Sequence, residues 1–157
     1  MTSPQPLPTK EDFNPWGPDD LDAEHAWKSF GNLTLDEAHA RFRECPELYH
    51  EDFMFMGGKA YAFYFPVIER FLYEVPEVAE VPDDREAWIL ACGIRSQLRA
   101  GTAPALQPLA DRIIALAQFV QSNIGRFGDD AEEWSEIEDE WRMVEEQMRE
   151  AVSNAGE

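Results

Sequence analysis

The chain has 157 residues, 44% of them hydrophobic and 12% aromatic, so it is long and apolar enough to form one domain with its own core. Its 32 acidic and 13 basic residues give a net charge of −19. Such a charge repels phosphate backbones and anionic lipid surfaces. It therefore argues against nucleic-acid and membrane partners and favours a basic protein partner.

The composition also favours helices over strands, and the cysteine content favours a reducing compartment. The chain has only seven Val, seven Ile and four Thr, which is few for a β-sandwich or barrel. Its two cysteines, Cys45 and Cys92, lack the spacing of a zinc site or a disulfide framework. Residues 1–10 do not resemble a signal peptide, and the most apolar stretch, 53–75, is interrupted by glycine, proline and charged residues. A cytoplasmic all-α protein is the expectation.

The first half of the chain is predicted to hold a tail and short helices. Residues 1–18 contain five prolines and show little periodicity, so we expect a flexible tail over 1–17 and a single helical domain over 18–157. A first helix should open near Pro18 and stop at Gly31. The residues from Thr34 to Glu37 match a capping box, which predicts a helix from Leu35 to about Glu44 that ends before Pro46.

The second half is predicted to hold longer helices. The apolar pattern indicates helices over 59–74, bent at Pro66, and over about 82–101, 105–127 and 130–152. Eight aromatic residues between Phe53 and Tyr73 are either core or, in part, an exposed interface patch. The whole is expected to be an irregular α-bundle of five to six helices with a proline-rich N-terminal tail.

The last predicted helix carries the strongest candidate for a binding site. Residues 129–150 contain eleven acids against two bases, and six apolar residues from Trp134 to Ala151 alternate at spacings of three and four. The acidic face could dock a basic protein or serve solubility alone, and the apolar seam could pair in a weak homodimer instead of a monomer. The residues that we expect to bind a partner are Glu133, Trp134, Glu136, Asp139, Glu140 and Trp141.

A second hypothesis concerns the three histidines, each of which has an acid three residues before it. The pairs are Asp22 with His25, Asp36 with His39, and Glu47 with His50. Residues three apart share a helix face, so a metal-binding bundle, with or without enzyme activity, could use His25, His39, His50 and Glu47. The simpler interpretation is exposed acid–histidine pairs, with no metal and no cofactor.

Signatures of other enzyme classes are scarce. The sequence has no G-x-S-x-G and no phosphate-binding glycine loop, and Cys92 falls on the apolar face of a predicted helix. A reactive pair of Cys45 with His39 or His50 stays open. We therefore expect a protein that is not an enzyme.

One segment resembles a known pattern. Residues 45–56, which read CPELYHEDFMFM, and residues 60–66, which read AYAFYFP, are similar to a pattern in small acidic bacterial proteins of uncharacterised function. In its small size and its acidity the chain is also similar to the immunity proteins of bacterial polymorphic toxin systems. That resemblance implies a cytosolic inhibitor that neutralises a basic toxin or effector domain through an acidic surface.

Overall fold

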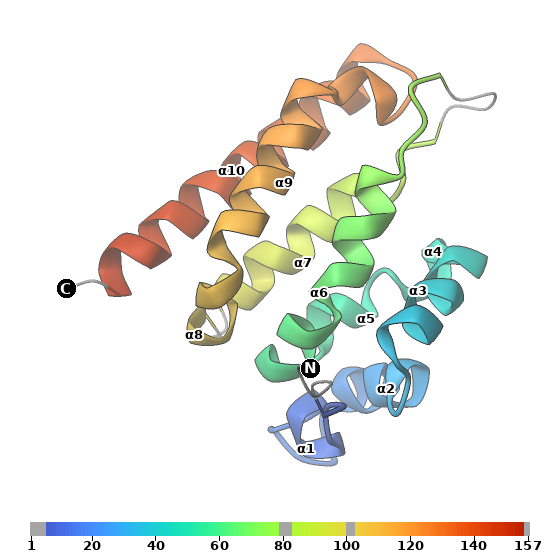
Figure 1. Ribbon diagram of the computed structural model, residues 1–157, viewed down its shortest axis with the longest axis vertical. Helices are drawn as coiled ribbons and strands as arrows, with labels where there is room; N and C mark the ends of the chain where they lie inside the picture. The colour runs from blue at the N-terminus through green and yellow to red at the C-terminus, as the bar shows by residue number, and fades with distance from the viewer. Residues whose placement is uncertain (1–5, 79–82, 100–102, 156–157) are drawn as a thin grey trace, which may run out of the picture.

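The computed structural model describes residues 6–78, 83–99 and 103–155, and every regular element within them is helical (Figure 1). The α-helices are α1 (Lys10–Phe13), α2 (Leu21–Phe30), α3 (Leu35–Glu44), α4 (Pro46–Tyr49), α5 (Asp52–Phe55), α6 (Gly58–Tyr73), α7 (Ala87–Arg99), α8 (Ala103–Leu106), α9 (Ala110–Ser122) and α10 (Ala131–Ala155). Two 3₁₀ turns, η1 (Gln107–Leu109) and η2 (Ile124–Arg126), flank α9. The all-α class is confirmed. The described segments outnumber the five to six predicted helices because single-turn helices lie between the long ones.

The helices form two hairpins with a layer of short helices beside them. Helices α9 and α10 run antiparallel as one hairpin, and α6 and α7 form the second (Figure 1). Of the short helices, α1 and α3 pack on α6, whereas α5 packs on α2 and α7. Helices α7 and α10 run in the same direction, and the Trp141 indole of α10 donates to the Ala87 carbonyl of α7 over 2.9 Å. No helix in the described residues is both long and apolar enough to cross a membrane.

Part of the segment predicted as a tail is packed onto the domain. Thr9 and Asp12 form a capping box that starts α1, and Phe13 is fully buried. The Gly57 amide donates to the Phe13 carbonyl over 2.8 Å, which ties α1 to the start of α6. The interpretation of residues 1–17 as a flexible tail is therefore not confirmed for residues 9–13, because the Phe13 ring is a core residue. Residues 1–5 lie outside the described ranges.

The predicted boundaries of α2 and α3 agree with the structure. Asp20 caps α2 and Gly31 follows its last residue. Thr34 and Glu37 form the expected capping box, and α3 spans the predicted residues. The Tyr64 hydroxyl of α6 fixes the turn between the two helices by hydrogen bonds to the carbonyls of Phe30 and Leu33, at 3.1 and 2.7 Å.

The aromatic residues of the first half form the core. Phe13, Phe30, Phe42, Phe53 and Phe71 are buried and meet one another or Tyr64 in edge-on and tilted ring contacts. Pairs of this geometry add about 0.5–1.5 kcal/mol beyond the burial of their area. Core packing is thus the main role of the cluster between Phe53 and Tyr73.

The helix predicted over 105–127 is interrupted in the structure. It is divided into α8, η1, α9 and η2. Pro108 lies within η1, and because it has no amide hydrogen it cannot continue the α-helical hydrogen-bond pattern. The single long helix was therefore a wrong prediction.

The apolar seam of α10 is used inside the molecule. Ile137, Trp141, Val144 and Met148 are buried, and α10 packs on both α7 and α9. The alternative of a homodimer paired through this seam therefore lacks exposed seam residues at these four positions. The packing leaves the acidic side of α10 facing outward.

Candidate functional site

The candidate site lies at the end of the molecule where two interhelix connections meet. The α6–α7 connection and the α9–α10 connection come together there, and the Gly128 amide donates to the Asp83 carbonyl over 3.2 Å (Figure 1). Asp130 starts α10, since its side chain accepts from the Glu133 amide over 2.8 Å. The first turns of α7 and α10 are thereby held side by side.

Three carboxylates crowd this end of the molecule. One oxygen from each of Asp129, Asp130 and Glu133 lies within 4.8 Å of the others. The pKa of Glu133 is raised, first by its partial desolvation and then by the charges of Asp84, Asp129, Asp130 and Glu136. Within the described ranges, no Lys, Arg or His lies within salt-bridge distance of the three crowded groups.

An exposed tryptophan of α7 lies near the same end of the molecule. On α7, Cys92 and Arg95 both contact Glu140 of α10, at 3.6 and 2.6 Å. Trp88 is one turn before Cys92 on the same α7 face, just as Glu136 is one turn before Glu140 on α10. Because the two helices run in the same direction, this register places Trp88 level with Glu136, and 45% of its surface is exposed. We call Asp84, Trp88, Asp129, Asp130, Glu133 and Glu136 the acidic end.

Some of the predicted partner-binding residues are accessible in the structure, and others are buried or already paired. Glu136 is exposed, and Glu133 and Trp134 are partly exposed, with the Trp134 indole donating to the Gly128 carbonyl over 3.1 Å. Asp139 is half exposed and pairs with Arg142 at 2.9 Å. These four residues stay candidates.

Two predicted partner-binding residues are unavailable. The exposed fraction of Trp141 is 0%, so its expected role as an exposed anchor is wrong. The Glu140 side chain is only 13% exposed and is paired with Arg95. Both lie on the face of α10 that meets α7, which the charge pattern of the sequence did not distinguish. Trp88 was missed, although an aromatic residue following Asp83 and Asp84 was a visible signal.

The histidines do not use the acids three residues before them. Their partners are distant in the sequence: His25 with Asp52 at 2.7 Å, His39 with Glu74 at 3.0 Å, and His50 with Glu86. The first pair links α2 to α5, and the second links α3 to the residue after α6. The third links the residue after α4 to the residue before α7. No histidine belongs to a group of three possible metal ligands in the described residues, so the proposed set of His25, His39, His50 and Glu47 is not assembled as one centre.

Among the described residues, the crowded carboxylates at the acidic end form a group with the spacing of metal ligands. Carboxylate oxygens suit Ca²⁺ or Mg²⁺, but these ions take at least six ligands. Three carboxylates, two of them exposed, do not distinguish a cation site from an acidic surface. We assign no metal there.

Cys92 of α7 is not an activated nucleophile. Burial, together with the Glu140 carboxylate, raises the pKa of Cys92 to about 11, so its thiol stays protonated at neutral pH.

The comparisons with known proteins add no relative. No protein-family model, no curated protein and no solved structure matches the chain.

Proposed function

We propose that the chain is a protein-binding inhibitor of the immunity type, which neutralises a basic toxin or effector domain in the cytosol by covering it with the acidic end. The observation that carries the proposal is the crowding of Asp129, Asp130 and Glu133, which have no cation of the described residues within salt-bridge distance. The exposed Trp88 lies near the start of the neighbouring helix α7. The chain's net charge of −19 would steer a basic partner towards it over long distances.

The chemistry of the acidic end fits Arg and Lys side chains. A cation placed between Asp130 and Glu133 would relieve the mutual repulsion of these carboxylates, so binding gains energy that a dispersed acidic surface does not offer. Trp88 can accept a guanidinium on its ring face, and tryptophans of this kind are frequent anchors of interfaces. An acidic face that served solubility alone would need neither feature.

The test is capture of a partner from the host's lysate by three versions of the tagged chain. The first is the wild type and the second carries Glu133→Lys, Glu136→Lys and Asp139→Lys at the site. The third, the α2–α3 variant, carries Asp19→Lys just before α2, Asp22→Lys on α2 and Glu44→Lys at the end of α3, which makes the same change in net charge away from the site. Retention of the partner is compared at about 0.1 M and about 0.5 M salt. The screening length falls about two-fold between them, so binding through charges weakens, whereas binding through apolar contacts does not.

We expect the wild type and the α2–α3 variant to retain the same basic protein at low salt and to lose most of it at high salt. The site variant should retain little at either salt concentration. Equal retention by all three chains would contradict a role for the acidic end. Retention lost equally by both variants would show that net charge alone matters.

A further inference from the structure

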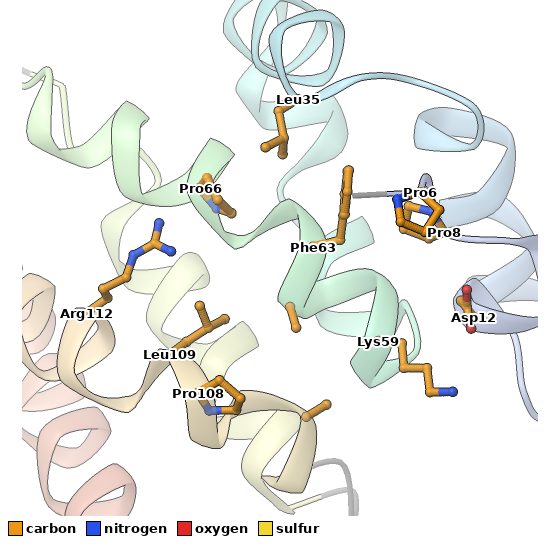
Figure 2. A pocket seen from close by; sticks show the side chains of 12 residues that line it. Pro6, Pro8, Asp12, Leu35, Lys59, Phe63, Pro66, Pro108, Leu109 and Arg112 are labelled. Atoms are coloured by element: carbon orange, nitrogen blue, oxygen red, sulfur yellow. The ribbon is translucent and has the colours of Figure 1, made fainter. Parts of the chain in front are cut away.

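The charged groups of α6 are arranged differently near its two ends. A groove between the first half of α6 and the segment from α8 to the start of α9 is lined by Lys59 and Asp12, whose charges offset each other, and by Arg112, which is paired with Glu69 (Figure 2). No net charge selects an occupant there. At the other end of α6, the carboxylate of Glu74 is shared between a buried histidine and an arginine.

The buried histidine is His39 of α3. It is one turn before Phe42, whose ring contacts Phe71 of α6, and only 4% of its own surface is exposed. Its Nε2 lies 3.0 Å from an oxygen of Glu74. Because a carboxylate accepts hydrogen bonds and does not donate them, this nitrogen carries a proton, so the neutral ring already satisfies the contact. A second proton would add a buried positive charge without adding this bond.

The Glu74 carboxylate already interacts with other cations. Its second oxygen lies 3.8 Å from Nε of Arg70, which is on α6. Arg85, two residues before α7, also interacts with the charge of Glu74, and its guanidinium is held in place by donating to the Phe71 carbonyl over 3.2 and 2.7 Å. Arg43, an exposed residue of α3, is a further positive charge near both His39 and Arg85.

The acids around this cluster match the arginines in number. The three acids and three arginines are Asp36, Glu74 and Asp83 with Arg43, Arg70 and Arg85. Asp36 lies 3.7 Å from Arg70, but its side chain is almost fully exposed. Glu47 is the charged residue of α4, which also packs on α3, and it is exposed and lies near Glu86 instead. A protonated His39 would therefore be a fourth cation without an acid of its own among these residues.

The direction of the pKa shift agrees with this arrangement. The pKa of His39 is lowered from its usual 6.5, first by burial and then by the charge of Arg70, although Glu74 acts in the opposite direction. A released and solvated His39 takes up a proton more readily than the packed one does. The packed state is therefore favoured above pH 6.5, and it loses this advantage as pH falls through the pKa of the packed histidine.

We propose that His39 is a pH sensor that releases α3 from the end of α6 in mildly acidic solution. The contacts that its protonation would loosen are the bond to Glu74 and the ring contact of Phe42 with Phe71, whose centroids lie 4.8 Å apart. Release would uncover Phe42, which is fully buried in the packed state. The device does not rest on the proposed function, because no partner protein is needed to operate or to test it.

The test is hydrogen exchange of the α3 amides between pH 5 and pH 7, corrected for the intrinsic pH dependence of exchange. Between the pKa of packed His39 and 6.5, the released form binds one proton more, so its fraction should rise up to about tenfold for each pH unit lost. His39→Gln keeps a donor for Glu74 but does not titrate, so its α3 protection should lose this dependence. His25→Gln, the matched change at an exposed histidine, should keep the dependence of the wild type.

A second measurement follows the imidazole itself by NMR. The ring of His39 should titrate below pH 6.5 in the wild type, and Arg70→Gln should raise its midpoint, because this change removes a cation that acts on the ring. The Arg70 side chain is half exposed, so the variant keeps the fold. The proposal is overturned if His39 titrates at or above pH 6.5, if α3 protection is the same at pH 5 and pH 7, or if His39→Gln keeps the dependence of the wild type.

Discussion

The carboxylates that meet the helices and turns from α2 to His50 are paired with histidines, whereas those that crowd the acidic end are not. In the first region, His25, His39 and His50 each bind a carboxylate contributed by a different, distant part of the chain. At the acidic end, Asp129, Asp130 and Glu133 crowd together with no cation of the described residues beside them. The partnered carboxylates hold helices together, whereas the crowded ones are free to meet another molecule.

The difference shows why net charge alone does not locate a binding surface. Glu140 and Glu133 belong to the same acidic helix, but the first is paired with Arg95 and the second has a raised pKa among other carboxylates. Like charges one helical turn apart cost a few tenths of a kcal/mol each. The folded chain tolerates this cost because the opposite face of α10 is buried.

The largest expected effect concerns that buried face. Trp141→Ala should lower the free energy of unfolding by about 3–5 kcal/mol, because it leaves a cavity and removes the bond to the Ala87 carbonyl. Trp134→Ala is the matched change near the start of the same helix, where the indole is only partly buried, and should cost about 1 kcal/mol. Urea denaturation measures both. Equal losses would mean that α10 is not anchored chiefly through Trp141.

An intermediate effect separates two tyrosines of α6 in the aromatic half. Tyr64→Phe should lose about 1–2 kcal/mol of stability, since its hydroxyl bonds the turn between α2 and α3. Tyr61→Phe should be neutral or stabilising, because the Tyr61 hydroxyl is buried without a partner and its removal relieves a desolvation cost. If Tyr61→Phe proved the more damaging change, the account of polar pairing in this half would be wrong.

The smallest expected effect concerns the acidic end itself. The pKa of Glu133 is raised in the folded state, so its contribution to stability declines as pH rises from the usual value of 4.5 through the folded pKa. Glu133→Gln should remove this decline and add a few tenths of a kcal/mol at pH 7 and low salt.

The control for that change is a glutamate of the same helix with the opposite shift. The pKa of Glu145 is lowered, first by its hydrogen bond from Arg149, so Glu145→Gln should reduce stability at pH 7. Thermal melting at pH 4 and pH 7 distinguishes the two variants. A loss of stability for both would contradict the idea that Glu133 is crowded.

Features with a local cause were predictable from the sequence. The capping box at Thr34 predicted the start of α3. The spacing of Ile137, Trp141, Val144 and Met148 predicted one apolar face of α10, although Trp141 was also expected to bind a partner. The helix at Lys10–Phe13 was missed although Thr9 and Asp12 carry the same kind of capping signal. The interruption near Pro108 had a local cause as well, the missing amide of proline.

Features that depend on tertiary contacts were not predictable in this way. The sequence pairs His25 with Asp22 on one helix face, but the folded chain brings Asp52 of α5 to the imidazole instead. In the same way, the charge pattern does not tell Glu136 from Glu140, because only the packing of α7 on α10 decides which one meets Arg95. The charge pattern therefore singled out a helix with an acidic outer face, but it did not show that Glu140 and Trp141 face α7.

The most direct test of the central claim compares two exposed tryptophans. A photo-crosslinking amino acid would replace Trp88 at the acidic end or Trp16, which is 51% exposed in the N-terminal region, and each chain would be irradiated in the host's lysate. The account predicts a basic protein crosslinked from position 88 and not from position 16, with the adduct lost at about 0.5 M salt. No adduct from position 88, or the same adduct from both positions, would contradict the claim that the acidic end is the docking surface.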